Sequence, residues 1–474
     1  MDNKKHEIGI IGLGVMGRNF AFNIADHGYS VIGLDKDADK VSKLTDQAGD
    51  KNVSGTDTPE AFVAGLQKPR AAMMLVPAGK AVDAVIDELL PLLNDGDLII
   101  DGGNSHFTDT NRRFAKLKNG GVHYLGVGIS GGEKGARFGP SIMPGGDEKA
   151  YERVRPIFES AAAHVNNEPC VTWLGPGSAG HYVKMVHNGI EYGVMQLLAE
   201  CYDLLKQGTG YSNPELHQVF KTWNEAELSS FLVEITAEIF AQPDDKSGED
   251  LIDMILDSAK QKGTGKWSSQ DAMELQVPTP VIDMAVAMRN MSAYKEERVH
   301  AAGVLDGPSI SFDGDKKSFE ELLRNALYFG MLATYAQGMA LLQAASKTYD
   351  YNLDLEEVAK IWRGGCIIRA DLLEPIRSAY QNNRNLPNLM VDPHFSKELM
   401  QRQADLRAVV QQATKWGISA PALMTSLAYF DGYRSNYLPA NLIQAQRDYF
   451  GSHTYERVDA EGTFHTQWNN QEKG

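Results

Sequence analysis

Short apolar runs alternate with helical patterns over the first third of the chain. Each run is bounded by turn-forming residues, which predicts a buried strand. The predicted strands are residues 7–12, 30–34, 71–76, 98–101, 123–129 and 171–174, and the last is expected to close the sheet. Strands that alternate with helices are typical of a parallel sheet covered by helices. Residues 1–178 are therefore expected to form an α/β domain.

The pattern changes after a glycine- and proline-rich segment at residues 175–180. From there on, apolar residues recur with the period of a helix. Helices are predicted at residues 180–208, 214–221, 225–241, 248–260, 269–274, 279–300, 317–347, 354–364, 367–382, 395–415 and 420–434. We expect a large all-α domain over residues 179–435 and a C-terminal tail over residues 436–474. The polar end of the tail is expected to be disordered unless a partner surface holds Phe464 and Trp468.

Glycines follow the first predicted strand in the pattern G-x-G-x-x-G, at Gly12-Leu13-Gly14-Val15-Met16-Gly17. A helical pattern comes next, so the motif has the strand–turn–helix setting that a dinucleotide site requires. Gly12 permits the tight turn, Gly14 lets the backbone approach a pyrophosphate, and Gly17 lets helix and strand pack closely. The N–H groups of the helix N-terminus then face the phosphates. The motif predicts a Rossmann-type domain that binds NAD or NADP.

Asp35 ends the second predicted strand, about 20 residues after the glycines, where a carboxylate binds the ribose hydroxyls of adenosine. A carboxylate repels a 2′-phosphate, so Asp35 and Asp37 favour NAD, while Lys36 offsets part of that preference. A turn-forming aspartate without a ligand is the alternative. Residues after other strands are also expected to contact the cofactor, because ligands bind at the carboxyl ends of parallel strands. They are Val76, Pro77, Ala78 and Asn104.

Small residues follow the predicted strand at residues 123–129, at Ser130-Gly131-Gly132. They can present backbone N–H groups and a hydroxyl to a carboxylate. A plain tight turn explains the spacing equally well, so both interpretations stay open.

The first long predicted helix carries a polar stripe of Lys184, His187, Asn188 and Glu191. At about 100° per residue these positions share one face, and a stripe of apolar residues lies beside it. Lys184 and Glu191 are on the order of 10 Å apart along the axis, too far for a routine surface ion pair. A solvated polar face is the alternative. The mixture of side chains, directly after a dinucleotide-binding unit, favours an acid/base apparatus.

Basic residues mark three further sites. A glycine-spaced loop holds Lys262 and Thr264 and suits a phosphate, although solvated lysines in a mobile loop are the alternative. Arg289 lies within an apolar helix and must pair with an anion, from the protein or from a ligand. Arg447 and His453 lie close to the C-terminus, and by themselves they indicate little.

The formal net charge of −16 argues against binding to nucleic acid or to an anionic membrane, so an anionic substrate needs a local basic pocket. The three cysteines are scattered, which excludes a disulfide framework and a CxxC metal site. No apolar run reaches the ~18 residues that span a bilayer. The apolar residues near the N-terminus are interpreted as a strand and not as a signal peptide. A cytoplasmic protein is therefore expected.

Taken together, these motifs resemble the 6-phosphogluconate dehydrogenase family, the decarboxylating enzymes of the pentose phosphate pathway. The similarity runs nearly end to end. Its specific segments are Asp101-Gly102-Gly103-Asn104-Ser105, Gly128-Ile129-Ser130-Gly131-Gly132-Glu133, and residues 184–192, 261–267 and 446–451. The resemblance implies a metal-independent oxidative decarboxylation of 6-phosphogluconate to ribulose 5-phosphate and carbon dioxide, with reduction of NADP or NAD.

The resemblance also implies a role for each site residue. Lys184 is the general base toward the 3-hydroxyl, and Glu191 is the general acid that protonates C1 of the enediol. These roles ask for a lowered pKa at Lys184 and a raised pKa at Glu191. The carboxylate and hydroxyl end of the substrate is expected at Asn104, Ser130, Gly131, Gly132, His187 and Asn188. Its phosphate end is expected at Tyr192, Lys262, Thr264, Arg289, Arg447 and His453, the last two donated by the other subunit of a homodimer.

The chain departs from many NADP-specific members of the family at two places. Those members carry Asn-Arg-Ser or Asn-Arg-Thr where this chain has Asp35-Lys36-Asp37, and Lys where it has Pro77. Both changes remove positive charge or donors near the cofactor. They predict NAD use comparable to, or better than, NADP use.

Two other functions fit part of the sequence. A shorter β-hydroxyacid dehydrogenase shares the Rossmann turn and a lysine on the first long helix, but it lacks the extended helical domain, the Lys262 loop and the tail. A non-catalytic dinucleotide-binding protein needs neither Lys184 nor Glu191.

Overall fold

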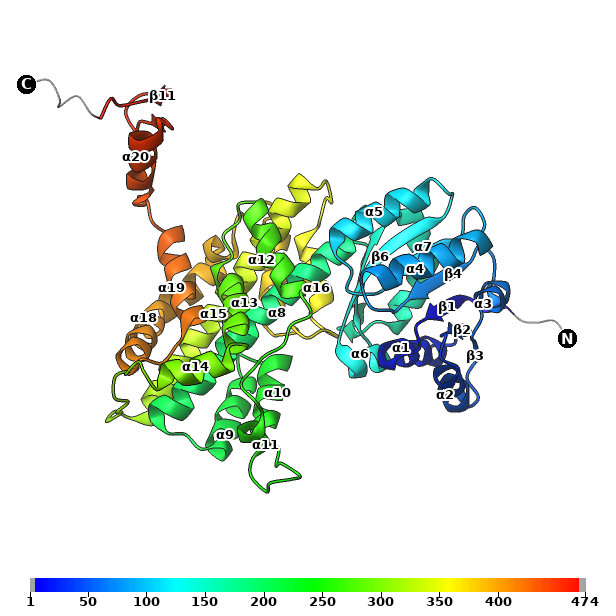
Figure 1. Ribbon diagram of the computed structural model, residues 1–474, viewed down its shortest axis with the longest axis horizontal. Helices are drawn as coiled ribbons and strands as arrows, with labels where there is room; N and C mark the ends of the chain where they lie inside the picture. The colour runs from blue at the N-terminus through cyan, green and yellow to red at the C-terminus, as the bar shows by residue number, and fades with distance from the viewer. Residues whose placement is uncertain (1–4, 469–474) are drawn as a thin grey trace, which may run out of the picture. The chain divides into compact units, whose positions relative to one another are not determined.

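The computed structural model describes residues 5–468 (Figure 1). These residues form two compact units that divide between Ser426 and Leu427. The first unit holds a seven-stranded sheet with its helices, followed by a large helical part. None of the helices in the described range combines the length and hydrophobicity that a membrane crossing requires. The predicted fold class is confirmed, while the predicted domain boundaries stay a prediction.

The sheet has the strand order β3-β2-β1-β4-β5-β6-β7. Its strands are β1 (Ile8–Ile11), β2 (Val31–Leu34), β3 (Val53–Thr56), β4 (Ala71–Met74), β5 (Leu98–Asp101), β6 (His123–Ser130) and β7 (Ser141–Gly146). All neighbours pair in parallel except β6 and β7, which are antiparallel. The central strands are buried along their whole length, which explains their continuous apolar sequences. The first six strands have the order of a dinucleotide-binding Rossmann sheet.

Helices cover the two faces of the sheet. They are α1 (Val15–Asp26), α2 (Ala38–Ala48), α3 (Pro59–Gly65), α4 (Lys80–Leu89), α5 (Phe107–Lys118), α6 (Gly132–Phe138) and α7 (Glu148–Ala161), with a 3-10 turn, η1 (Leu90–Leu92), after α4. Phe20 of α1 and Phe158 of α7 share one apolar cluster with the sheet, and Phe62 of α3 and Val82 of α4 share another. The sheet is thus buried between two helical layers.

The sheet differs from the sequence prediction at its edges. The predicted strand at residues 171–174 does not form, and Val171 makes only a single parallel bridge with Ile142 of β7. Strands β3 and β7 are not among the predicted strands. β3 is half-buried and holds one large apolar residue, while β7 contains Pro144 and two glycines. Neither has an apolar run, so their pairing depends on neighbouring strands more than on their own composition.

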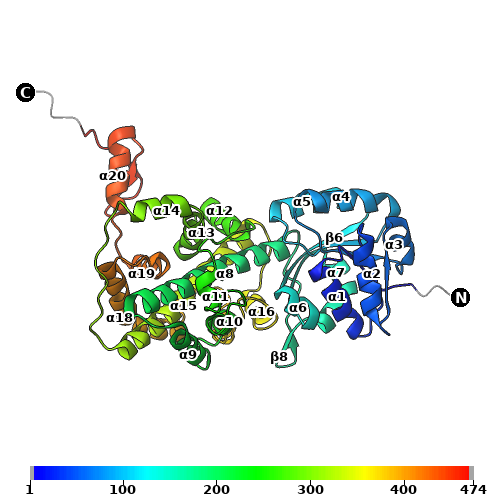
Figure 2. The same cartoon turned by 60° about the horizontal axis from the view of Figure 1, so that its bottom comes forward.

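The helical part is built around two long helices, α8 and α15. Its helices are α8 (Ala179–Asp203), α9 (Asn213–Asn224), α10 (Phe231–Phe240), α11 (Leu251–Met254), α12 (Thr264–Glu274), α13 (Pro280–Ser292), α14 (Lys295–Ala302), α15 (Lys316–Thr348), α16 (Leu355–Trp362), α17 (Leu373–Asn382), α18 (Pro393–Trp416) and α19 (Pro421–Tyr433), with a π turn, η2 (Leu204–Gly208), and a 3-10 turn, η3 (Leu389–Val391). α8 and α15 lie side by side (Figure 2). Glycines allow this contact, since a Cβ at Gly193 would lie 2.6 Å from Cγ2 of Thr334.

Four predicted helices are longer than those that form. The one at residues 367–382 begins only at Leu373 of α17. The one at residues 225–241 begins only after Ser230, whose hydroxyl caps α10. The one at residues 248–260 reduces to α11. The one at residues 279–300 divides into α13 and α14 at residues 293–294. In each case the helical spacing of apolar residues continues in the sequence beyond the residues that form the helix.

The tail has a structure of its own. α20 (Ala440–Gly451) is followed by a hairpin of β10 (Tyr455–Glu456) and β11 (Thr463–Phe464). The buried carboxylate of Asp448 accepts hydrogen bonds from the backbone of Thr454 and Thr466 and from the indole of Trp468. The expectation of a disordered end is therefore wrong up to Trp468, and residues 469–474 lie outside the described range.

Helix α8 begins directly on the sheet, and glycines make this possible. A Cβ at Gly180 would lie 2.2 Å from the carbonyl oxygen of Met143 and 2.4 Å from that of Gly126. One turn later, a Cβ at Gly128 would lie 2.3 Å from Cβ of Lys184. Protein Cβ atoms essentially never approach so closely, so the backbones of β6, β7 and α8 touch. The position of Lys184 is fixed by this contact.

Replacing Gly128 by Ala is expected to destabilise the fold and to displace Lys184. The added methyl has no space, which lowers the free energy of unfolding by about 1–3 kcal/mol. Gly307→Ala is the matched control, because nothing lies within 4 Å of a Cβ at that residue. Denaturant unfolding measures both variants, and equal free energies of unfolding would contradict the tight contact.

Candidate active site

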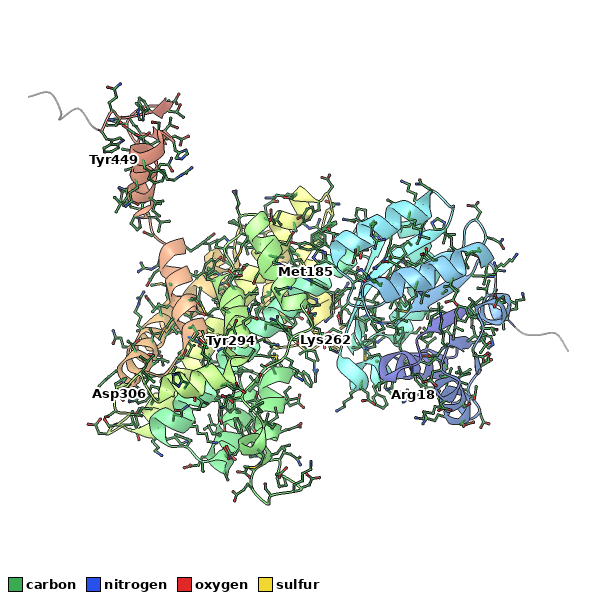
Figure 3. All side chains as sticks on the ribbon, in the orientation of Figure 1. Arg18, Met185, Lys262, Tyr294, Asp306 and Tyr449 are labelled. Atoms are coloured by element: carbon green, nitrogen blue, oxygen red, sulfur yellow. The ribbon has the colours of Figure 1, made fainter. Side chains whose placement is uncertain are left out.

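The polar stripe of α8 is buried where the helix leaves the sheet. Met185, labelled in Figure 3, marks this turn. The Lys184 residue is only 6% exposed, and its Nζ donates to Oδ1 of Asn188 at 2.7 Å and lies 3.3 Å from Nδ1 of His187. The other ring nitrogen of His187 lies 3.0 Å from Oγ of Ser130, at the end of β6. The structure thus brings together residues that the sequence predicted from two separate stretches, and a solvated polar face is excluded.

The two candidate acid/base groups have pKa values shifted in opposite directions. Burial lowers the pKa of the Lys184 amine, because the charged ammonium loses its hydration, and the nearby Glu191 carboxylate opposes this. Burial raises the pKa of the Glu191 carboxyl, against the charges of Lys184 and Arg289. Burial also lowers the pKa of His187, whose Nδ1 lies 3.8 Å from Oε2 of Glu191. The pKa of each group is thus shifted in the expected direction, while the catalytic roles of Lys184 and Glu191 stay a prediction.

The turn after β6 meets a loop that the sequence interpretation missed. Gly131 has φ of +125°, and a Cβ there would lie 2.4 Å from the carbonyl oxygen of Gly365. In the same loop, the backbone N–H of Ile367 donates to Oγ of Ser130 at 3.3 Å. The loop therefore helps to orient the Ser130 hydroxyl, which contacts His187 as well. In the sequence, the only indication of this loop is the pair Gly364-Gly365 after a helical pattern.

Tyr192 joins the residues predicted for the phosphate. The guanidinium of Arg289 lies 3.5 Å from the centroid of its ring. A Cβ at Gly265 would lie 2.3 Å from Cδ2 of the same ring, so the start of α12, with Thr264, packs on Tyr192. Lys262, labelled in Figure 3, is exposed on the preceding loop. Within residues 5–468, Arg289 has no carboxylate oxygen within 4.0 Å, so its charge is available to a ligand.

Arg447 and His453 lie in the second compact unit. Arg447 donates to Oε1 of Gln444 at 3.1 Å, and the ring of His453 meets Phe450 edge-on. Arg447 belongs to α20, and His453 precedes Thr454, whose N–H donates to Asp448. Their part in a substrate site stays a prediction.

A cavity of about 750 Å³ opens at the carboxyl ends of β1, β2 and β4. Its lining includes the predicted residues Gly12, Gly14, Asp35, Lys36, Val76 and Pro77. Sequence reasoning missed Lys40, Asp57 and Glu88, which also line it. Leu13, Val15 and Met16 continue the glycine turn into α1, and Ala78 and Asn104 are exposed beyond β4 and β5.

The turn in this cavity fits the pyrophosphate of a dinucleotide. Gly12 has φ of +91°, and a Cβ at Gly17 would lie 1.9 Å from its carbonyl oxygen, so helix and turn are in contact. Nothing lies within 4 Å of a Cβ at Gly14, and no side chain caps the N-terminus of α1. The first N–H groups of α1 can therefore bind an anion.

Asp35 has two functions in this cavity. Its Oδ2 accepts a hydrogen bond from the backbone N–H of Leu13 at 2.8 Å, and its Oδ1 accepts one from the backbone N–H of Asp37 at 3.0 Å. Oδ1 also lies 3.5 Å from Nζ of Lys40. The carboxylate thus orders the turn, as the alternative interpretation proposed, and it also lines the cavity.

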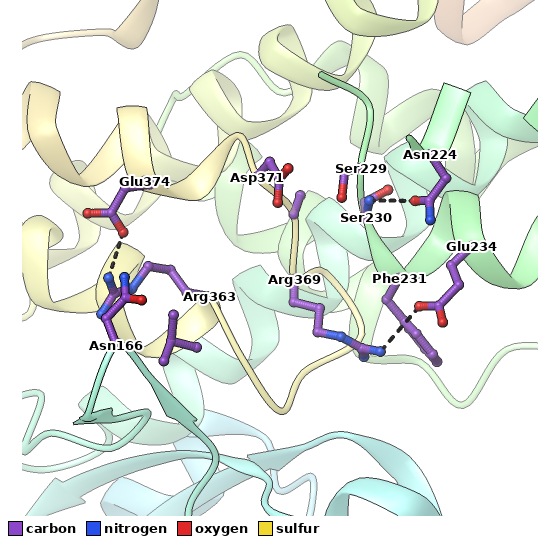
Figure 4. A pocket seen from close by; sticks show the side chains of 12 residues that line it. Asn166, Asn224, Ser229, Ser230, Phe231, Glu234, Arg363, Arg369, Asp371 and Glu374 are labelled. Carbon is purple, nitrogen blue, oxygen red and sulfur yellow. Dashed lines mark hydrogen bonds and ion pairs between the residues drawn. The ribbon is translucent and has the colours of Figure 1, made fainter. Parts of the chain in front are cut away.

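Arg363 and residues 369–371 help to line a second cavity, of about 420 Å³ (Figure 4). Arg369 stacks on Phe231 with 3.9 Å between its Cζ and the ring centroid. Arg363 pairs with Glu374 at 2.6 Å. None of the predicted site residues lines this cavity, and its charged groups largely pair with each other. Neither here nor elsewhere in residues 5–468 do three or more His, Cys, Asp or Glu side chains gather as a metal site requires.

Two family models match consecutive parts of the chain. Residues 7–175 match the NAD binding domain of 6-phosphogluconate dehydrogenase, and residues 180–468 match its C-terminal domain. The two matches meet at the start of α8.

Full-length proteins are similar as well. The NADP(+)-dependent, decarboxylating 6-phosphogluconate dehydrogenase of Bacillus subtilis is 51% identical over 98% of this chain and 99% of its own. The decarboxylating enzyme of Lactococcus lactis is 50% identical over 97% and 98%. The Plasmodium falciparum 6-phosphogluconate dehydrogenase, solved in its apo form, with NADP+ and with 6-phosphogluconate, is 46% identical, with a TM-score of 0.95 over 98% of this chain and 100% of its own. The chain therefore belongs to the 6-phosphogluconate dehydrogenase family.

Proposed function

We propose that this protein converts 6-phosphogluconate to ribulose 5-phosphate and carbon dioxide while reducing NADP or NAD, as a step of the pentose phosphate pathway. One observation carries the proposal: α8 holds a buried amine of lowered pKa and a half-buried carboxyl of raised pKa, Lys184 and Glu191. Lys184 packs on β6 near the carboxyl end of the sheet, and the dinucleotide cavity opens at the carboxyl ends of β1, β2 and β4. The relatives named for this reaction support it.

Lys184 acts as the general base. Its neutral amine takes the proton of the 3-hydroxyl of the substrate. The nicotinamide ring, when bound, supplies the acceptor for the hydride that leaves C3. The new ammonium stays beside Asn188 and stabilises the oxyanion that forms on the 3-keto intermediate as carbon dioxide leaves. Because this buried charge can stabilise the oxyanion directly, the proposed reaction is metal-independent.

Glu191 acts as the general acid. After carbon dioxide leaves, C1 of the enediol needs a proton, and a carboxyl with a raised pKa retains one to higher pH. As carbon dioxide leaves, the Lys184 ammonium donates its proton to the enolate oxygen, which gives the enediol. When Glu191 protonates C1, the neutral Lys184 takes that hydroxyl proton back and the ketone forms. The cycle ends with Lys184 protonated and Glu191 ionised, and transfer of one proton through solvent restores both groups. Two groups on one helix, two turns apart, thus serve the two ends of the reacting fragment.

The remaining site residues bind the two ends of the substrate. We assign the carboxylate and hydroxyl end to Asn104, Ser130, Gly131, Gly132, His187 and Asn188. We assign the phosphate end to Tyr192, Lys262, Thr264 and Arg289, with Arg447 and His453 from the other subunit of a homodimer. The charge of Arg289 supports the phosphate assignment, because this half-buried guanidinium has no carboxylate partner among the described residues. The domain division at residues 178/179 and 435/436 belongs to the same proposal.

The cofactor is assigned to the 750 Å³ cavity. The turn from Gly12 to Gly17 would hold the pyrophosphate and Asp35 the adenosine ribose, with Lys36, Asp37, Val76, Pro77, Ala78 and Asn104 around them. We propose NAD use comparable to, or better than, NADP use, because carboxylates dominate the adenosine end. The Bacillus subtilis relative is named for NADP+, so this preference would distinguish the chain from that relative.

Lys184→Met is expected to lower kcat by at least about 10²- to 10⁴-fold, since the general base is lost. The dissociation constant of the cofactor should stay nearly the same, because Lys184 does not line the nucleotide cavity. The control is Lys116→Met on α5, an exposed lysine paired with Asp87. Carbon dioxide release and reduced nicotinamide are measured together, and unchanged turnover in Lys184→Met would remove the catalytic assignment.

The pH profile of kcat/KM is expected to be bell-shaped. Activity requires Lys184 unprotonated, so it falls when the pH drops below the lowered pKa of the amine. It also requires Glu191 protonated, so it falls when the pH rises past the raised pKa of the carboxyl. Glu191→Gln should therefore lower the rate and abolish the alkaline decline, leaving a rise to a plateau. The exposed Glu152→Gln serves as control, and an alkaline decline that persists in Glu191→Gln would assign that limb to another group.

The double variant Asp35→Asn, Lys36→Arg is expected to raise the NADP to NAD ratio of kcat/KM by about tenfold, because a repelling carboxylate becomes neutral beside a phosphate-binding guanidinium. Asp46→Asn removes the same charge from an exposed position on α2, outside the cavity lining, and is the control. Parallel assays with NAD and NADP give the ratio. An unchanged ratio would contradict the part assigned to Asp35.

A further inference from the structure

An ion pair crosses the adenosine end of the nucleotide cavity. Lys36 follows β2, and Glu88 lies in the last turn of α4, so they approach from opposite walls. Nζ of Lys36 lies 3.0 Å from Oε2 of Glu88, with 76% and 36% of the two side chains exposed. The cation that a 2′-phosphate would use is thus already bound to a carboxylate.

Lys40, the second lysine that lines the cavity, is also paired with carboxylates. Nζ of Lys40 lies 3.5 Å from Oδ1 of Asp35 and 3.7 Å from Oδ2 of Asp37. Asp57 adds a further carboxylate to the lining. The two lysines, Lys36 and Lys40, are therefore outnumbered by the carboxylates of Asp35, Asp37, Asp57 and Glu88 around them. A ribose with a free 2′-hydroxyl needs no cation here, whereas a 2′-phosphate carries close to two negative charges that need partners.

We infer that Glu88 is a specificity-determining residue that acts through Lys36: by holding this lysine across the cavity, it disfavours nucleotides with a 2′-phosphate. The inference rests on the proposed function, because it assigns the cavity to a nicotinamide dinucleotide. It adds a residue about fifty positions from the end of β2, where sequence patterns place the determinant of cofactor choice.

Glu88 can be changed more cleanly than Asp35. Asp35 also orders the glycine turn, through the N–H of Leu13. Within the described residues, Glu88 makes no hydrogen bond or ion pair other than that with Lys36. Both partners are exposed, and an exposed ion pair contributes little to stability. Glu88→Gln should therefore free Lys36 without disturbing the fold.

The experiment measures binding and not turnover. Isothermal titration of the full-length protein gives dissociation constants for NAD+, NADP+ and the fragments 5′-AMP and adenosine 2′,5′-bisphosphate. In Glu88→Gln, NADP+ and the bisphosphate should bind about twofold to fivefold more tightly, the upper part of the range of one exposed ion pair. NAD+ and 5′-AMP should change less than twofold. The gain should shrink at high salt, because the groups are exposed to screening.

Two controls test the route of the effect. Asp87→Asn removes the same charge one residue away on α4, where the carboxylate pairs with Lys116 outside the cavity, and it should leave the NADP+ to NAD+ ratio unchanged. Lys36→Met combined with Glu88→Gln should lose the gain. An unchanged ratio in Glu88→Gln, or a gain that survives without Lys36, overturns the inference. If the wild-type protein binds neither NAD+ nor NADP+, the proposed function itself is wrong.

Discussion

The close contact between α8 and the end of the sheet is the constraint on which the rest of this structure depends. Glycines at the contact, on β6, β7 and the first turn of α8, remove every side chain that would separate the backbones. Lys184 therefore packs against the sheet and is buried. The same packing that joins the nucleotide-binding part to the helical part shifts the pKa of the amine toward that of a base. The packing of α8 on the sheet thus contributes both to the fold and to the lowered pKa of Lys184.

The two ends of the site treat charge in opposite ways. The half-buried guanidinium of Arg289 stacks on an aromatic ring and has no carboxylate in contact among the described residues, so an anion from outside can become its partner. At the adenosine end of the nucleotide cavity, each lysine already meets a carboxylate. Under the proposed function, a protein with a formal net charge of −16 would thus bind a phosphorylated acid at one end and disfavour a 2′-phosphate at the other. The difference lies in local pairing and not in the overall charge.

Hydrogen bonds from distant segments orient the groups that would meet the substrate. The Ser130 hydroxyl contacts His187 on one side and the backbone of Ile367 on the other. In the tail, Asp448 plays a comparable part, because its buried carboxylate joins the end of α20 and the hairpin into one small unit. In both places a single polar group joins three segments of chain and so fixes the geometry of the residues beside it.

The sequence by itself determined the features that repeat over short distances along the chain. These are the central strands, the glycine turn, the long helices and the stripe from Lys184 to Glu191, since each depends on local periodicity or on the backbone freedom of glycine. It did not determine β3 and β7, the end of the helix at residues 248–260, or the fold of the tail. Only the tertiary structure decided that the loop at Ile367 holds Ser130, that Glu88 holds Lys36, and that Lys184 is buried. Each of these depends on residues that come together from distant parts of the chain. Burial and charge pairing are set by the folded environment of a residue, which no single segment determines.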